Sequence, residues 1–376
     1  MTSKEIELGN LLDRIADELN ITPTMMEKAV DSYNAVGEWI GDGIDYSVTI
    51  KPQGSMNLGT VIRPIDDSDD YDMDLVCLLE DGTDLSSKKI KNVVGDRLKE
   101  NKRYKQMLEK EGRRCWTMQY DEFHMDILPC THKEQNSKST AIRLTHKQDD
   151  GTYDEKFSDP EAYHNWFVSK MTLNNMGKSN VLEARADTKI DKVPTYKRRT
   201  TLQKAIQLLK RHRDILFADN SDDAPISVII TTLAALAYNG EQNLYEALKF
   251  ITEKMPSYIV DNGEGYNIKN PVMEEENFAD KWNEDEKKAH AFYKWMTAVR
   301  SDLLENPLRL VGIDAIGESL MITLGEAPVK RALNKYGEDI KGSRDNGTLY
   351  VNGTTGGLST AAAVGINVKG HTFFGI

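Results

Sequence analysis

The sequence has 376 residues, 39% of them hydrophobic and 29% charged, which is typical of a globular protein of about two domains. Acidic residues outnumber basic ones by 60 to 48, and this net charge of −12 argues against a protein that coats duplex DNA. The three cysteines include no Cys-x-x-Cys pair, so we expect no zinc ribbon or disulfide scaffold and infer a cytoplasmic protein. The first residues lack the apolar segment of a signal peptide, and the longest apolar stretch, 226–238, is too short to span a membrane.

The N-terminal part of the chain alternates helical and extended patterns. Apolar residues recur at helical spacing up to Leu19, and Thr22-Pro23 starts a second helix, because proline is favoured in a first helical turn. The pattern then predicts a strand at 45–52, a short helix up to residue 60, an apolar strand at 73–79, a helix at 85–110 and strands at 115–120 and 123–128, the last ended by Pro129.

The pattern becomes mostly helical after about residue 160, with helices expected at 200–217, 225–238, 282–304 and 325–341. The residues after 341 are rich in Gly, Thr, Asn and Ala and have no helical period. We therefore predict an α+β fold with an N-terminal domain at 1–160, a helical domain at 161–341 and a flexible tail at 342–376.

Two aspartates begin the apolar strand. Asp72 and Asp74 are two residues apart, so on a strand they point to the same face. Two ionised carboxylates at such a short distance repel each other unless a cation lies between them. Asp126 lies in a later apolar strand and is a candidate third acid, because an unpaired buried charge is costly. Such hard oxygen ligands suit Mg²⁺ or Mn²⁺, and three of them predict a site for two metal ions.

The segment Gln53-Gly54-Ser55 precedes the two aspartates. A glycine lets the backbone approach a phosphate, and the Ser55 hydroxyl can donate to a phosphate oxygen. A triphosphate held there, beside two metals, is arranged for nucleotidyl transfer. Gly-Ser pairs and Asp-x-Asp pairs are each common in turns and loops, so the prediction depends on their combination with Asp126.

These residues resemble a known family. Gln53-Gly54-Ser55, the run 70–77 and His124-Met125-Asp126 are similar to motifs of the cGAS/DncV-like nucleotidyltransferases (CD-NTases) of bacterial CBASS anti-phage systems. The likeness covers about residues 45–240 and implies a polymerase-β-like nucleotidyltransferase domain, a mixed sheet with flanking helices, packed on a helical second domain. It implies that Asp72, Asp74 and Asp126 hold the metals and that Gln53 and Ser55 contact the donor nucleotide.

The resemblance also implies an activity, the synthesis of a cyclic oligonucleotide second messenger from ATP, alone or with another nucleoside triphosphate. The messenger would act on a separate effector protein. A linear oligoadenylate synthetase or an RNA-end nucleotidyltransferase is the first alternative. An inactive nucleotide-binding or partner-binding module is the second, and the intact set of three acids counts against it. The sequence leaves base, ring size and linkage open, because they depend on the shape of the pocket.

The family also binds phosphate from its helical domain through a lysine and a serine. On the expected helix at 200–217, Lys210 lies at the edge of the apolar stripe, about 80° from its centre, whereas Lys204 lies roughly 160° away and should face solvent. We therefore predict Lys210 as the phosphate ligand, against the alternative of a surface lysine whose stem covers apolar neighbours. Ser227 is the candidate serine, with a helix cap as its alternative role.

The last eight residues, 369–376, contain Phe-Phe-Gly after a Gly- and Thr-rich stretch. They resemble the C-termini of CBASS synthases that partner with E1/E2-like ancillary proteins, which implies a peptide gripped by such a protein. The alternative is a disordered chain end.

Overall fold

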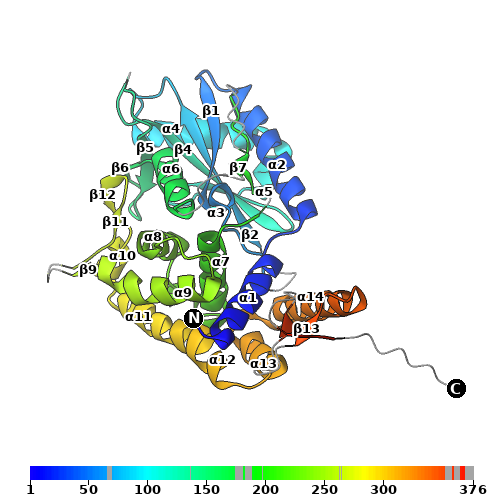
Figure 1. Ribbon diagram of the computed structural model, residues 1–376. Coiled ribbons are helices and arrows are strands. Elements are labelled where there is room, and N and C mark those ends of the chain that lie inside the picture. Colours follow the sequence, from blue (N-terminus) through cyan, green and yellow to red (C-terminus); the bar gives the residue numbers. More distant parts are fainter. Residues whose placement is uncertain are drawn as a thin grey trace.

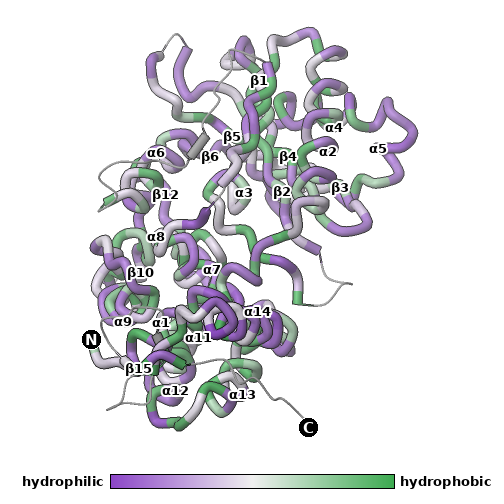
Figure 2. The backbone as a smooth tube through the Cα atoms, turned by 45° about the vertical axis from the view of Figure 1, so that its right-hand side comes forward, coloured by the Kyte–Doolittle hydropathy of each residue, from purple (hydrophilic) through white to green (hydrophobic). Residues whose placement is uncertain are grey.

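A computed structural model shows two packed units, a sheet with its helices in the upper half of Figure 1 and a helical unit in the lower half. The same division is visible after the rotation in Figure 2. The structure describes residues 1–65, 70–135, 137–173, 181–182, 189–196, 198–261, 263, 265–351, 358–359 and 365–368.

The main sheet is mixed and has six strands in the order β1-β2-β4-β5-β6, with β3 paired to β4 beside β5. Its strands are β1 (Val48–Gln53), β2 (Tyr71–Leu79), β3 (Trp116–Gln119), β4 (Phe123–His132), β5 (Ile142–Lys147) and β6 (Tyr153–Ser158). Strands β2 and β4 pair in parallel, and the other neighbours are antiparallel. This pairing brings the two predicted acidic strands side by side.

The two faces of the sheet are covered differently. Alternate apolar residues of β1 and β2, such as Ile50, Met73 and Leu75, form one core with α2 (Pro23–Gly41) and α4 (Ser87–Glu100). Side chains from the other face, among them Val76 and Leu78, form a smaller cluster with β4 and β5. On this second face lies α6 (Pro160–Met171), which contacts β1 and α3 (Gly54–Leu58).

The helical unit surrounds a large apolar core. Its helices are α1 (Ser3–Glu18), α7 (Thr201–Leu216), α8 (Ser227–Ala237), α9 (Leu244–Lys254), α10 (Asp280–Glu284), α11 (Lys287–Val299), α12 (Asn306–Arg309), α13 (Ile313–Leu324) and α14 (Glu326–Asp345), with a π-helical turn at Arg300–Glu305. Although α1 is first in sequence, its apolar face packs in this core, whereas α2 packs on the sheet. Figure 2 shows that α14 is hydrophilic over much of its length, and only three of its residues are buried.

The remaining elements are short. They are α5 (Lys102–Met107), 3-10 turns at Ser221–Asp223 and Met255–Tyr258, and the strands β7 (Val181–Leu182), β8 (Thr195–Tyr196), β9 (Val260–Asp261), β10 (Tyr266–Asn267), β11 (Lys269–Asn270), β12 (Met273–Asn277), β13 (Tyr350–Val351), β14 (Leu358–Ser359) and β15 (Ile366–Asn367). None of the described helices is both long and apolar enough to cross a bilayer.

The mixed sheet with flanking helices and the helical unit confirm the predicted fold class. The prediction that Pro129 ends its strand was wrong, because β4 continues to His132. Pro129 is paired with Cys77 of β2, but on the other side of β4 the pairing with β3 stops at Ile127 and the pairing with β5 starts at Cys130. On that side no N–H donor is needed at Pro129.

Other boundaries also differ from the prediction. The expected helix at 85–110 is divided into α4 and α5 at Asn101, whose side chain caps the second helix. Sequence reasoning also missed the β5–β6 hairpin. Helix α14 ends at Asp345 rather than at 341, and three short strands follow it.

Candidate active site

Three aspartates lie together on one face of the sheet. Asp72 and Asp74 are on β2, and the parallel register places Asp74 directly beside Asp126 of β4. Like residues i and i+2 of a strand, laterally paired residues share a face, so the pairing brings together carboxylates that are far apart in sequence. Asp126 is further fixed by Thr117 of β3, whose hydroxyl donates to its Oδ1 at 2.5 Å.

The three carboxylates perturb one another. Burial, and after it the negative charges of Asp72 and Asp126, raise the pKa of Asp74 to about 7. Burial and the charge of Asp126 also raise the pKa of Asp72, although the Asp72 side chain remains accessible to solvent. Asp72 is thus a solvent-accessible carboxylate whose charged form is disfavoured by its surroundings. The site carries more negative charge than its surroundings balance.

Gly54 allows the chain to turn beside Asp74. Its φ of +65° lies in the left-handed region, and a Cβ atom there would lie 1.8 Å from Asp74 Oδ2. Gln53, the last residue of β1, is directly opposite Asp74 in the register. Ser55 follows in the first turn of α3, where its carbonyl oxygen accepts a hydrogen bond from the Thr60 N–H at 2.9 Å. The predicted Gln53-Gly54-Ser55 segment therefore borders the aspartates.

The three aspartates are the candidate ligands for the predicted metal ions. Hard carboxylate oxygens with unbalanced negative charge suit Mg²⁺ or Mn²⁺. In the described part of the chain, however, no three His, Cys, Asp or Glu side chains are gathered closely enough to form a ready metal site. The residues fit the metals in chemistry and in their shared face, and the carboxylates would have to draw closer to share an ion.

Lys210 of α7 supplies positive charge near the aspartates. Its ammonium group is buried and donates to the carbonyl oxygen of Thr60 at 3.2 Å and to its hydroxyl at 3.3 Å. Burial is the main cause that lowers the pKa of Lys210 to about 8, and the charge of Arg213 acts in the same direction. Asp72 and Asp74 oppose this shift, so the ammonium group lies within electrostatic range of both.

The expectation that Lys204 faces solvent was wrong. Lys204 is only 8% exposed, and its ammonium group forms ion pairs with Asp13 at 2.8 Å and Asp17 at 2.9 Å. Both partners are on α1, which covers the face of α7 opposite the apolar stripe. Helical geometry placed Lys204 correctly away from that stripe, but it could not indicate that an acidic helix from the N-terminus packs there.

Ser227 contacts an arginine and not Lys210. It is the first residue of α8, which has no side-chain cap, so Ser227 does not play the alternative role of a helix cap either. Its hydroxyl accepts a hydrogen bond from Arg213 Nη1 at 3.0 Å, and the same nitrogen donates to the carbonyl oxygen of Pro225 at 3.0 Å. The Arg213 charge opposes the rise in the pKa of Asp72, so this guanidinium group lies near the aspartates.

Sequence reasoning missed Arg213 and Thr117 as candidate site residues. Arg213 follows Lys210 by three positions, so both lie on one side of α7, and this spacing was a usable signal. Thr117 is opposite Asp126 in the β3–β4 register, which a hairpin centred near residue 121 would have predicted. His124 is beside Asp72 in the register and lies 3.5 Å from Asp70.

Comparison with known proteins identifies the sheet unit. Residues 48–129, from β1 to Pro129, match the family described as "Cyclic GMP-AMP synthase DncV-like, nucleotidyltransferase domain". This segment of the chain is a DncV-like nucleotidyltransferase domain. The matched residues contain the three aspartates and the Gln53-Gly54-Ser55 segment, so the family resemblance noted in the sequence is confirmed.

Two curated proteins resemble this nucleotidyltransferase over nearly its whole length. A c-di-GMP synthase of Roseivirga ehrenbergii is 27% identical and aligns with 100% of this chain and 99% of its own. The cyclic dinucleotide synthase CdnG of Bradyrhizobium diazoefficiens is 25% identical over 96% of this chain and 90% of its own. The likeness therefore includes the helical unit as well as the sheet.

Solved structures agree on the fold. The structure of Bradyrhizobium diazoefficiens CdnG in complex with GTP matches with a TM-score of 0.66 at 20% identity, covering 88% of this chain and 99% of that one. A complex of E. coli CdnC with HORMA matches with a TM-score of 0.58 at 14% identity, covering 84% of this chain and 96% of that one. At these identities the likeness concerns the arrangement of the two units.

Proposed function

We propose that this nucleotidyltransferase joins purine nucleoside triphosphates into a cyclic dinucleotide that serves as a second messenger. The observation that carries the proposal is the convergence of Asp72, Asp74 and Asp126 on one sheet face beside Gly54 and Ser55. The full-length likeness to two named cyclic dinucleotide synthases supports it.

Guanine is the base that we propose first. The sequence resemblance suggested ATP, but one curated relative is named a c-di-GMP synthase, and the CdnG structure is a complex with GTP. A chain similar to both is best tested with GTP as donor and acceptor, and ATP is the competing substrate.

The residues of the site have distinct proposed roles. Bound Mg²⁺ or Mn²⁺ would neutralise charge on the triphosphate and on the attacking hydroxyl. The Ser55 hydroxyl donates to a phosphate oxygen, and Gly54 lets the backbone approach it. Lys210 and Arg213 place positive charge near the aspartates, where the triphosphate would lie. Asp126, held by Thr117, is the proposed acceptor of the proton from the attacking hydroxyl.

The biological setting belongs to the same proposal. The messenger would act in the cytosol on a separate effector during anti-phage defence, as the family resemblance implies. An E1/E2-like protein would grip residues 369–376, which lie outside the described residues. The HORMA partner seen with CdnC is a property of that protein, and it makes an ancillary partner a reasonable subject for a pull-down experiment.

The test is product analysis by mass spectrometry. The full chain is incubated with Mg²⁺ and either GTP, ATP or all four nucleoside triphosphates, and the products are then treated with phosphatase. We expect a phosphatase-resistant product that contains guanine. A phosphatase-sensitive product would support the linear synthetase instead. Absence of metal-dependent pyrophosphate release in every mixture would support the inactive module.

A further inference from the structure

A cavity lies on the same face of the sheet as the aspartates. Its volume is about 300 Å³, and its floor is formed by the apolar side chains of Val76, Leu78 and Ile142. Val76 follows Asp74 by two residues on β2, so the cavity begins where the acidic part of that strand ends. Asn57 lines it from α3, the helix whose first turn carries Ser55.

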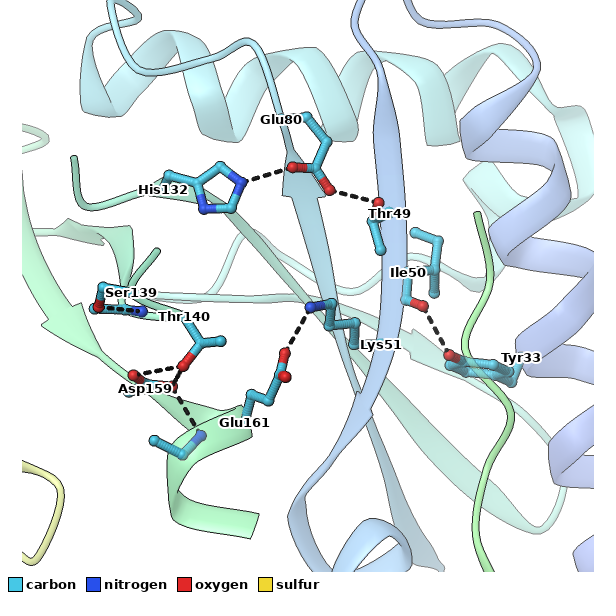
Figure 3. Close-up of polar contacts among 12 residues, drawn as sticks. Tyr33, Thr49, Ile50, Lys51, Glu80, His132, Ser139, Thr140, Asp159 and Glu161 are labelled. Carbon is cyan, nitrogen blue, oxygen red and sulfur yellow. Dashed lines mark hydrogen bonds and ion pairs between the residues drawn. The ribbon is translucent and has the colours of Figure 1, made fainter. Parts of the chain in front are cut away.

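The polar groups around this cavity are held in place by one another (Figure 3). Lys51 forms an ion pair with Glu161 at 2.7 Å, and His132 contacts Glu80 at 2.6 Å. Such contacts fix the side chains, and the Lys51–Glu161 pair leaves no net charge. The walls are therefore shaped before any ligand arrives, which lowers the entropic cost of binding.

A third interaction fixes the part of the cavity wall formed by the β4–β5 loop and α6. The Thr140 hydroxyl donates to the Asp159 carboxylate at 2.8 Å, and the same carboxylate caps α6 by accepting from the Ala162 N–H at 2.9 Å. Figure 3 shows these groups beside Glu161, below Lys51. The loop between β4 and β5 is thereby joined to the first turn of α6.

Two lysines at the opening are not balanced in this way. Lys138 and Lys192 line the cavity and are exposed, and in the described part of the chain neither side chain has a hydrogen bond or ion pair. The carboxylate of Asp191 also lines the cavity, so the lining carries three ammonium groups, of Lys51, Lys138 and Lys192, against the carboxylates of Glu161 and Asp191. The excess of one positive charge lies with the two lysines that have no partner among the described residues. Positive charge above an apolar floor selects for a ligand with both an anionic group and an apolar body.

We propose that this cavity is a binding site for a small organic anion that carries a flat apolar ring, separate from the catalytic site. The ring would lie on Val76, Leu78 and Ile142, and the anionic group would face Lys138 and Lys192. A volume of about 300 Å³ is at the lower end of small-molecule pockets, which fits one ring system with one charged group. The assignment does not depend on the chemistry at the aspartates.

The test uses phenyl phosphate as a probe of both features. Binding to the full chain is measured by isothermal titration calorimetry, with phenol and inorganic phosphate as probes of the ring and the charge alone. We expect saturable binding of phenyl phosphate, at least tenfold tighter than either simpler probe. Equal affinity for inorganic phosphate, or no saturable binding of phenyl phosphate, would overturn the proposal.

Variants locate the bound probe. Lys138→Glu with Lys192→Glu should weaken phenyl phosphate binding at least tenfold, whereas Lys89→Glu with Lys105→Glu, a matched pair of exposed lysines elsewhere, should leave it unchanged. Leu78→Trp should fill the cavity and abolish binding, and circular dichroism checks that it folds. If it does not fold, the lysine pairs still decide the question. Displacement of the probe by GTP, or its loss in Asp74→Asn, would place it at the catalytic site and overturn the proposal.

Discussion

One face of β2 carries charged side chains in its first half and apolar side chains in its second half. In the first half, Asp72 and Asp74 lie beside Asp126, and their mutual repulsion is left largely uncompensated. In the second half, Val76 and Leu78 form an apolar floor whose polar neighbours are joined in pairs. Structural stability favours the second arrangement, so the first is best explained by a function that requires negative charge. A substitution in each half should therefore have opposite consequences.

The largest expected effect is on catalysis. Asp74→Asn should lower product formation by about a thousandfold or more, roughly 4 kcal/mol of transition-state stabilisation, while the protein stays folded. Initial rates of pyrophosphate release and circular dichroism measure the two properties. Asp96→Asn on the exposed surface of α4 is the control. Turnover at the wild-type rate in Asp74→Asn would exclude the proposed role.

The next effect concerns stability in the second half. Leu78→Ala should lower the free energy of unfolding by about 2–5 kcal/mol, because it removes buried methyl groups and enlarges a cavity. Urea denaturation measures it. Activity per folded molecule should change far less than in Asp74→Asn. A stable but inactive Leu78→Ala would show that catalysis depends on the apolar half of the face as well as on the acidic half.

The pH dependence of stability should sharpen the comparison. The pKa of Asp74 is about 7 in the folded protein and 3.8 ordinarily, so between these values the folded state holds more protons than the unfolded state. In EDTA, stability should therefore fall by about 1–3 kcal/mol as the pH rises from 4 to 7, relative to Asp74→Asn. Mg²⁺ should restore more of it at pH 8 than at pH 5. Identical urea midpoints for both proteins across this range would contradict the electrostatic account.

The smallest effect is expected at the Lys51–Glu161 pair. Both side chains are partly exposed, at 30% and 24%, so Glu161→Gln should lower the free energy of unfolding by only about 0.5–1 kcal/mol. Thermal denaturation compares it with Glu326→Gln, which removes an exposed pair on α14. A loss several times larger would mean that the pair shapes the cavity more strongly than its exposure suggests.

Local patterns in the sequence were enough to predict much of the catalytic face. The spacing of Asp72 and Asp74 fixed their shared face, and the cost of a buried unpaired charge indicated Asp126. What local patterns could not provide were partners that meet only through long-range packing. Lys204 binds acids of α1 almost two hundred residues earlier in the chain, and Ser227 binds Arg213 through the α7–α8 contact.

The cavity was not predicted for the same reason. Its lining comes from β1, β2, β4, β5, the β4–β5 loop, α3, α6 and the segment around Lys192, so no single stretch of sequence carries its signature. The strands β5 and β6 that border this region were also missed, although Ile142 and Leu144 alternate with polar residues. The predicted strand at 123–128 was shorter than β4 because the sequence does not show which strands pair with it. A proline fits within a strand only where its missing N–H faces no paired neighbour.

The placement of α1 has a consequence for how the protein acquires its structure. This helix is made before the helices that it contacts, which include α7, α9, α12 and α14, and its acidic residues bind Lys204, Arg331 and Lys335. Its apolar face must therefore stay uncovered until α7, which begins at Thr201, has been synthesised, whereas α2, next in the chain, can dock on the sheet earlier. Helix α1 therefore joins its core later in synthesis than α2 can join the sheet.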